Sequence, residues 1–300
     1  MVPILIGVML IVFAIMEMTP GDPALKIVGT EASPEAVQAQ RVLMGLDKPF
    51  FTRVFLYAKG IVTKFDFGTS WRTGRPVFED IGPRLPVSIR IGICSIIVSV
   101  VLGIPLGVYS AVKQNTLGDN LMRVMSTVFV AMPNFWLGML LILAFSLYLK
   151  LLPPVDNGSW VCYIMPVLAS GLPASCRVLR LTRSSMLESI RADYVRTARA
   201  KGTPELRVTY RHALMNALLP VVTTVGSSFG TILGGAIISE TVFSMSGMGS
   251  LMVLSIRSKD TPVIVSSVLL LAFYFSVVIL IVDILIAFID PRTKAKIKNS

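Results

Sequence analysis

Charged residues and histidine are scarce in this chain. Lys, Arg, Asp and Glu together make up only 15% of its 300 residues, whereas a typical soluble domain has about 25%. Hydrophobic residues make up 54% of the chain and the mean hydropathy is +0.74, so the composition indicates an integral membrane protein. His212 is the single histidine, which nearly excludes histidine-based metal or triad chemistry.

The sequence also lacks two kinds of motif that would assign chemistry to it. Its three cysteines lie in apolar stretches without C-x-x-C spacing, at Cys94, Cys162 and Cys176. They indicate small core residues rather than a disulfide framework or a zinc site. No G-x-x-x-x-G-K-[ST] loop occurs, so the chain lacks the phosphate cradle with which P-loop proteins hold ATP.

The positive charge is unevenly distributed. The formal net charge is +11, a balance that nucleic-acid-binding proteins and membrane proteins share. Nine Lys or Arg residues fall in the stretch 177–211 and four more in the stretch 290–300. Such clusters in short loops are typical of the cytoplasmic side of a membrane protein. We therefore expect both termini and the basic loop to face the cytoplasm, and we expect no nucleic-acid partner.

Six segments are apolar over about the 20 residues that a spanning helix needs. They are approximately Val2–Met18, Val87–Val112, Leu121–Leu149, Val161–Leu179, Ala213–Ile238 and Val263–Ile289. The first lacks a basic leader region and a small-residue cleavage site, which favours an uncleaved anchor over a signal peptide. Pro133 lies inside the third segment, and Pro166, Gly171 and Pro173 are expected to break the fourth.

These segments predict an all-α integral membrane protein. Its parts are a first transmembrane helix (1–18), an extracytoplasmic segment (19–86), a five-helix core (87–289) with a cytoplasmic loop (181–213), and a cytoplasmic tail (290–300). Within the extracytoplasmic segment, Ser33, Pro34 and Gly45 stand where a helix takes its N-cap, its first residue and its C-terminal stop. We expect a small, mainly helical subdomain there; an ordinary solvated loop is the alternative.

The cytoplasmic loop has the pattern of two helices joined at a glycine. The run "SSMLESIRADYVRTARAKG" is rich in helix formers and ends on Gly202, which suits a left-handed C-cap. A second helix is expected to follow from Thr203 onward. Ala198 and Gly202 are four residues apart and share a face, which would let another chain approach closely. The alternative is a basic loop whose charge serves orientation alone.

The same stretch resembles a signature of bacterial ABC-importer permeases. Residues 196–202 are similar to the motif E-A-A-x-x-x-G, matched at Ala198 and Gly202, with Arg196 and Thr197 in place of the Glu and first Ala. The strings "LTRSSMLE", "DYVRTARAKG" and "RHALMNALLPVVT" are similar to those of the dipeptide/oligopeptide/nickel branch, as are "TPGDPA", "GLDKP", "RLPVSI" and "ETVFSMSGMG". Their joint occurrence in this order covers nearly the whole chain.

The resemblance implies a six-span permease fold with a cytoplasmic coupling helix, in the bacterial cytoplasmic (inner) membrane. It implies that a second permease, two cytoplasmic ATPases and an extracytoplasmic binding protein are partners, together with the lipid bilayer. ATP and Mg would be bound by the ATPases, and this chain would be a transport subunit with no cofactor and no enzyme activity. The coupling helix would comprise Asp193, Tyr194, Val195, Arg196, Thr197, Ala198, Arg199, Ala200, Lys201 and Gly202. Di- or oligopeptides are the expected substrate; nickel, metal chelates and glutathione-like compounds are alternatives.

Several residues in the spans are candidates for the pathway or for packing. Gly226, Gly230 and Gly234 recur every four residues, a pattern that lets helix backbones approach closely in lipid. They indicate a permease–permease interface, the translocation pathway, or tight packing within the chain. Pro133 is a further candidate. Asp283 lies in the sixth span, where a carboxylate is costly; pairing with a nearby Arg or Ser is the favoured interpretation, and a gate or cation site is the alternative.

The stretch 240–260 is too polar to span a membrane and too apolar for a free loop. We interpret it as an outer, partly re-entrant segment that helps to close the pathway, with Glu240, Phe243, Met245 and Met248 as outer-gate residues. The methionines could be soft metal ligands, but gap filling is the favoured role, and we expect no metal site.

Two other classes of function fit the sequence less well. An ion-coupled secondary carrier usually shows internal repeats and paired charges at mid-membrane, and here only Asp283 and Arg90 approach this, both near span ends. A membrane-embedded enzyme would need a His/Glu metal motif or an intramembrane Ser with a base, and neither is present in the sequence.

Overall fold

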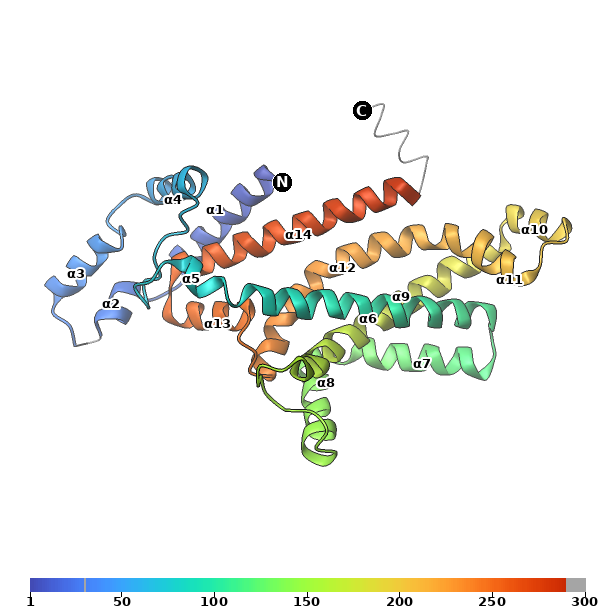
Figure 1. Cartoon of the computed structure of the whole chain (residues 1–300). Coiled ribbons are helices and arrows are strands. Elements are labelled where there is room, and N and C mark those ends of the chain that lie inside the picture. The colour runs from blue at the N-terminus through green and yellow to red at the C-terminus, as the bar shows by residue number, and fades with distance from the viewer. Residues whose placement is uncertain (30, 290–300) are drawn as a thin grey trace, which may run out of the picture. The chain divides into compact units, whose positions relative to one another are not determined.

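The computed structural model describes residues 1–29 and 31–289. Over these residues the secondary structure is helical, apart from one isolated β-bridge between Thr69 and Pro76 (Figure 1). The predicted tail 290–300 lies outside the described residues. The chain divides into two compact units, which are treated separately below: unit 1 (residues 1–88 and 246–276) and unit 2 (residues 89–245 and from 277 onward).

Unit 1 is built mainly from short helices. They are α1 (Val2–Met18), α2 (Pro23–Val28), α3 (Pro34–Leu43), α4 (Phe50–Lys64), α5 (Val77–Ile81) and α13 (Met248–Ser258), with the first part of α14 (Thr261–Ile289). The helix predicted from its capping residues is α3: the Ser33 hydroxyl accepts a hydrogen bond from the Ala36 amide at 3.2 Å, and Gly45 has φ +69°. The stretch between α1 and α5 is therefore largely helical rather than an irregular loop.

The turn between α13 and α14 ties two loops of unit 1 together. Lys259 caps α13 in the left-handed conformation, with φ +57°. Its ammonium donates hydrogen bonds to the carbonyls of Thr19, Pro20 and Gly21. The next residue, Asp260, is also buried, and its carboxylate accepts hydrogen bonds from the 70–72 turn. Burial lowers the pKa of the Lys259 ammonium below its ordinary value.

Unit 2 is built around α9 (Ile164–Arg191), whose neighbours are α7 (Leu117–Ala131), α8 (Asn134–Leu141) and α12 (Leu214–Val242). The other elements of this unit are α6 (Leu85–Val112, from Ile89 on), η1 (Ile142–Tyr148), η2 (Trp160–Tyr163), α10 (Asp193–Ala200), α11 (Glu205–Arg207) and η3 (Val208–Ala213). Two glycines let α6 pack directly on α9. A Cβ atom built at Gly103 would lie 2.7 Å from the Val178 Cβ, and one at Gly107 would lie 2.6 Å from the Thr182 Cβ.

Within the described part of the chain, four helices are long and apolar enough to cross a membrane. They are Leu85–Val112, Trp160–Arg191, Glu205–Val242 and Thr261–Ile284. A fifth span is possible if α7 and the following helix to Tyr148 are counted together, but these are bent by 105°. The helix α1 is apolar but has only 17 residues, so the count of six spans stays a prediction.

The structure corrects two predictions about helix breaks. The segment around Pro133 is not one continuous helix, because α7 ends at Ala131 and α8 begins at Asn134 after the sharp bend. Conversely, α9 is continuous over 28 residues where a broken span was predicted. Pro166 lies in its first turn, where an amide has no helical acceptor in any case. Gly171 permits close packing instead: its Cβ would lie 3.1 Å from the Val98 Cβ of α6.

Candidate functional site

The candidate site is the short helix α10, which follows the end of α9 in unit 2 (Figure 1). Ala192 makes the corner between the two helices, because its extended backbone (φ −70°, ψ 151°) ends α9 and begins α10. The helix ends in a Schellman motif. Gly202 has φ +76°, its amide donates to the Arg199 carbonyl at 2.9 Å, and the Thr203 amide donates to the Ala198 carbonyl at 3.2 Å. The glycine stop predicted from the sequence is present.

One edge of α10 is buried against the rest of unit 2. Val195 is fully buried and Ala198 is 8% exposed. They belong to an apolar cluster, here called the α10 anchor, which also contains Val108, Ala111, Met186, Val208, Ala213 and Ala217. These residues come from α6, α9, η3 and α12, so the anchor attaches α10 to four other elements.

The opposite face of α10 is exposed. The side chains on it include Tyr194, Arg196, Thr197 and Lys201. Asp193 and Arg196 form an ion pair at 3.6 Å on the surface of the helix, with side chains 97% and 73% exposed. The exposed surface is therefore polar and mostly basic, while the buried edge is apolar.

An ion pair closes the turn after α10. The Arg199 guanidinium donates to both carboxylate oxygens of Glu205, at 2.7 and 3.3 Å. The carboxylate raises the pKa of Arg199 above its ordinary value. Because both side chains are substantially exposed, the pair orients α10 relative to α11 more than it stabilises the fold.

A buried ion pair lies deeper in unit 2. Arg183 of α9 donates to the two oxygens of Asp119 at 2.7 and 2.8 Å, and the Asp119 side chain is fully buried. The Asp119 carboxylate also accepts from the Ser110 hydroxyl and from the Asn115 amide, the latter at 2.9 Å. The Thr116 hydroxyl in turn accepts from the Asp119 amide. The pair fixes the N-terminus of α7 and the end of α6 to α9.

Sequence analysis missed this ion pair, although two signals were available. Thr116 and Asp119 have the spacing of a helix capping box, and Arg183 was counted only as one of the basic residues of the cytoplasmic loop. Neither signal identifies the partner, which lies 64 residues away.

The glycines of α12 differ from one another in their surroundings. A Cβ at Gly226 would lie 2.6 Å from Val282 of α14, so this glycine serves packing within the chain. Gly230 is half-buried. Gly234 is exposed and nothing lies within 4 Å of its Cβ position. The three residues therefore have different surroundings within this chain, and their role at an interface or in the pathway stays a prediction.

The remaining predicted site residues also lie in different environments. Asp283 is exposed, and it makes no hydrogen bond or ion pair with any residue that the structure describes. Pro133 is the N-cap residue of α8 at the bend. The predicted outer-gate residues are all buried: Glu240, Phe243 and Met245 in unit 2, and Met248 in unit 1.

Met245 and Met248 are both buried. Met248 packs in an apolar cluster with Val77, Ile81, Leu251 and Val263. In unit 2, Phe243 lies over Gly138, whose Cβ would be 3.2 Å from the ring. Among residues 1–29 and 31–289, no group of three or more His, Cys, Asp or Glu side chains could hold a metal ion.

Comparison with known proteins identifies the family. Residues 103–295 match the profile of the binding-protein-dependent transport system inner membrane component, and residues 1–92 match the corresponding N-terminal profile. The dipeptide transport system permease protein DppB of Alkalihalophilus pseudofirmus is 38% identical over 322 positions, covering 98% of this chain and 96% of that protein. The glutathione transport system permease protein GsiC of Escherichia coli K12 is 39% identical over 296 positions, covering 99% and 96%.

A solved structure has a similar fold. It is described as an inward-facing conformation of the MetNI methionine ABC transporter, and it aligns with a TM-score of 0.57 and 17% identity over 68% of this chain and 93% of that chain. The predicted resemblance is thereby confirmed. This chain belongs to the binding-protein-dependent transport system inner membrane components, and it is a permease subunit of an ABC importer, a type of subunit that is not itself an enzyme.

Proposed function

We propose that this subunit forms half of the translocation pathway of an importer for di- or oligopeptides, which an extracytoplasmic binding protein delivers. The support is the similarity over nearly the full chain to permeases named for dipeptide and for glutathione transport. Because glutathione is itself a small peptide, a glutathione-like substrate is the second candidate.

We infer that α10 is the coupling helix that contacts a cytoplasmic ATPase. The observation that carries this inference is its division into a buried edge and an exposed face. Val195 and Ala198 hold the helix in unit 2, whereas Tyr194, Arg196 and Lys201 are free to contact a partner. In this proposal ATP and Mg are bound by two partner ATPases, and this chain holds no cofactor.

The rest of the proposed assembly follows from the same function. A second, homologous permease completes the pathway, and both termini of this chain face the cytoplasm of a bacterial cell. Gly234 of α12 is available for close contact with that permease, because no atom of the described residues outside its own helix lies within 4 Å of its Cβ position. Labelling of cysteines introduced at Lys201 and at Lys48 with a membrane-impermeant reagent tests the orientation; only the second is expected to react in intact cells.

Charge reversal on α10 tests its coupling role. We expect Arg196→Glu and Lys201→Glu to leave membrane insertion unchanged but to lower co-purification with the ATPases and substrate-stimulated ATP hydrolysis in the reconstituted complex. The matched control is Lys113→Glu, an equally exposed lysine after α6. Full coupling in the two α10 variants would refute the assignment. Uptake of trialanine compared with glutathione distinguishes the two substrate candidates.

A further inference from the structure

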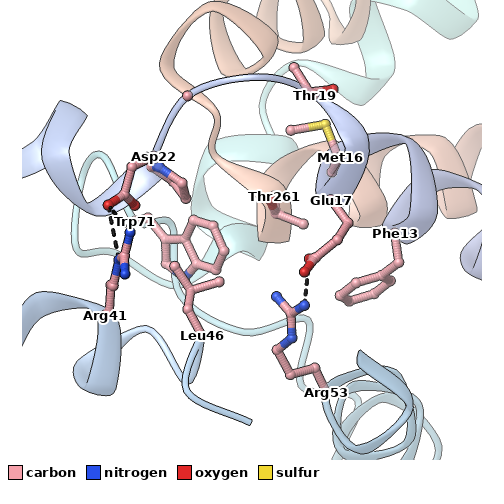
Figure 2. A pocket seen from close by; sticks show the side chains of 12 residues that line it. Phe13, Met16, Glu17, Thr19, Asp22, Arg41, Leu46, Arg53, Trp71 and Thr261 are labelled. Carbon is pink, nitrogen blue, oxygen red and sulfur yellow. Dashed lines mark hydrogen bonds and ion pairs between the residues drawn. The ribbon is translucent and has the colours of Figure 1, made fainter. Parts of the chain in front are cut away.

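Unit 1 contains a cavity that includes none of the candidate site residues described above. It has a volume of about 360 Å³, within the range of small-molecule sites, which is roughly 300–1,000 Å³. It lies between the last turn of α1, the start of α2, the residues around α3 and α4, and the 71 turn (Figure 2). All of its lining residues belong to unit 1.

The cavity is lined by two acids and two bases. Glu17 and Arg53 form one ion pair, and Asp22 and Arg41 form the other, the latter at 2.8 Å (Figure 2). These four are the only charged side chains in the lining, so its formal charge is zero. A ligand with only a negative charge would be repelled by the two carboxylates, and a ligand with only a positive charge would be repelled by the two guanidinium groups.

Arg53 has unused hydrogen-bonding capacity. A guanidinium carries five N–H donors, but Arg53 bonds to Glu17 through Nη2 alone, and its buried Nε has no partner among the residues that the structure describes. Its side chain is 14% exposed, whereas that of Glu17 is 54% exposed. The Nη1 group has no hydrogen bond to a described residue either and is left for an anionic oxygen that enters the cavity, while Glu17 stays accessible to an ammonium group.

Large apolar side chains also line the cavity, whose surface is otherwise mainly polar. Phe13, Leu46 and Trp71 line the cavity beside the ion pairs (Figure 2). A second cavity, of about 270 Å³, shares Phe13, Arg53 and Trp71 with the first and extends along Leu56 and Tyr57. A ligand that joins charged groups to an apolar part would match both compartments.

The backbone of this cavity is held in place before any ligand binds. The Lys259 ammonium binds the carbonyls at positions 19–21, at 2.8 Å from Thr19 and 2.5 Å from Gly21. Asp260 accepts from the Trp71 amide at 3.0 Å and from the Arg72 amide at 3.3 Å. Two segments of the lining are therefore fixed by the adjacent residues Lys259 and Asp260, which lowers the conformational entropy that the protein loses when a ligand binds.

We propose that this cavity binds a zwitterion, a compact molecule with one ammonium group, one anionic group and an apolar part. The ammonium group of the ligand lies at Glu17 and its anionic group at Arg53, so each charge of the ligand gains a partner. An uncompensated buried charge, which would be costly, is thereby avoided. Two kinds of compound carry such a zwitterion: a free short peptide or amino acid, and the headgroup of phosphatidylethanolamine. The proposal does not depend on which substrate the importer carries.

Equilibrium dialysis of the full chain in lipid nanodiscs tests the proposal. The probe is radiolabelled trialanine, and the bilayer is pure phosphatidylglycerol, which offers no zwitterionic headgroup. We expect trialanine to bind, and N-acetyl-trialanine and trialanine amide, which each lack one charge, to bind about tenfold more weakly. In a second arm, phosphatidylethanolamine is added to the nanodisc. If it displaces trialanine and stays bound to the protein in native mass spectrometry, the lipid headgroup is the ligand.

Variants separate binding at this cavity from binding elsewhere. Arg53→Gln is expected to weaken binding about tenfold, whereas Arg75→Gln is the matched control, because Arg75 pairs with Asp80 in the same unit outside the cavity. The double variant Glu17→Arg/Arg53→Glu keeps one acid and one base and is expected to restore binding, which a misfolded protein would not. Absence of both trialanine binding and lipid retention, equal affinity for the blocked peptides, or unchanged binding in Arg53→Gln would overturn the proposal.

Discussion

Replacing Arg183 by methionine should destabilise unit 2 through the carboxylate that it leaves behind. The Asp119 side chain is fully buried. In the variant it would keep the Ser110 hydroxyl and the Asn115 amide as donors but lose two charge-assisted bonds and its only counter-charge among the described residues. Removing one partner of a buried ion pair costs about 3–5 kcal/mol. Because 18% of the Arg183 side chain is exposed, water reaches part of the site, and we expect a loss near the lower end of that range.

A double variant distinguishes the charge from the packing. Replacing a buried ion pair by apolar groups of similar size is often close to neutral, so Asp119→Leu combined with Arg183→Met should be more stable than Arg183→Met alone. Arg199→Met is the matched control. Its partner Glu205 is mostly exposed, and breaking an exposed pair has little effect on stability.

The assay is unfolding of the purified full chain by increasing SDS in mixed micelles, followed by far-ultraviolet circular dichroism. We expect the midpoint to fall clearly for Arg183→Met, to recover partly in the double variant, and to stay unchanged for Arg199→Met. If the Arg183 variant unfolded at the wild-type midpoint, or if the double variant were the least stable of the three, the buried pair would not be holding α7 to α9 by charge.

Three further changes test separate contacts. Gly107→Val should separate α6 from α9, because the new Cβ would lie 2.6 Å from Thr182 Cβ; a lowered unfolding midpoint checks this, with Gly7→Val, where nothing lies within 4 Å, as control. Gly202→Ala places a side chain at φ +76°, which should lower the stability of the α10 turn by about 1–2 kcal/mol and reduce coupled ATP hydrolysis. Asparagine tolerates this conformation better, so Gly202→Asn should retain more of the coupled ATP hydrolysis than Gly202→Ala. Lys259→Met should increase hydrogen exchange at residues 15–24, since three carbonyls lose their donor; unchanged exchange would contradict the clamp.

Sequence analysis predicted the features that depend on neighbouring residues. The start of α3 at Ser33 and the stop of α10 at Gly202 follow from capping preferences within one turn of helix. The family followed from several strings in order. Both kinds of signal are contained in short stretches, so they do not require knowledge of how distant helices pack.

The features that were missed or wrong depend on distant contacts. The continuity of α9 through Gly171 reflects its packing on Val98 of α6, which no local pattern reports. The outer-gate role of Phe243 and Met248 stays a prediction; the fold buries them in different units, which their closeness in the chain does not indicate. The zwitterion cavity joins residues from 13 to 261, and its four charged residues gave no common motif.

If α10 is the coupling helix that we propose, its two sides give a helix of eight residues a way to transmit force. Its buried edge contacts α6, α9 and α12 through the α10 anchor, so α10 cannot move alone without exposing apolar surface, at a cost of about 25 cal/mol for each Å². In the proposed mechanism, a push on Arg196 or Lys201 is therefore carried by Val195 and Ala198 into the helices that pack along α9. In that proposal the basic residues contact the partner, while Val195 and Ala198 hold the helix to the rest of unit 2.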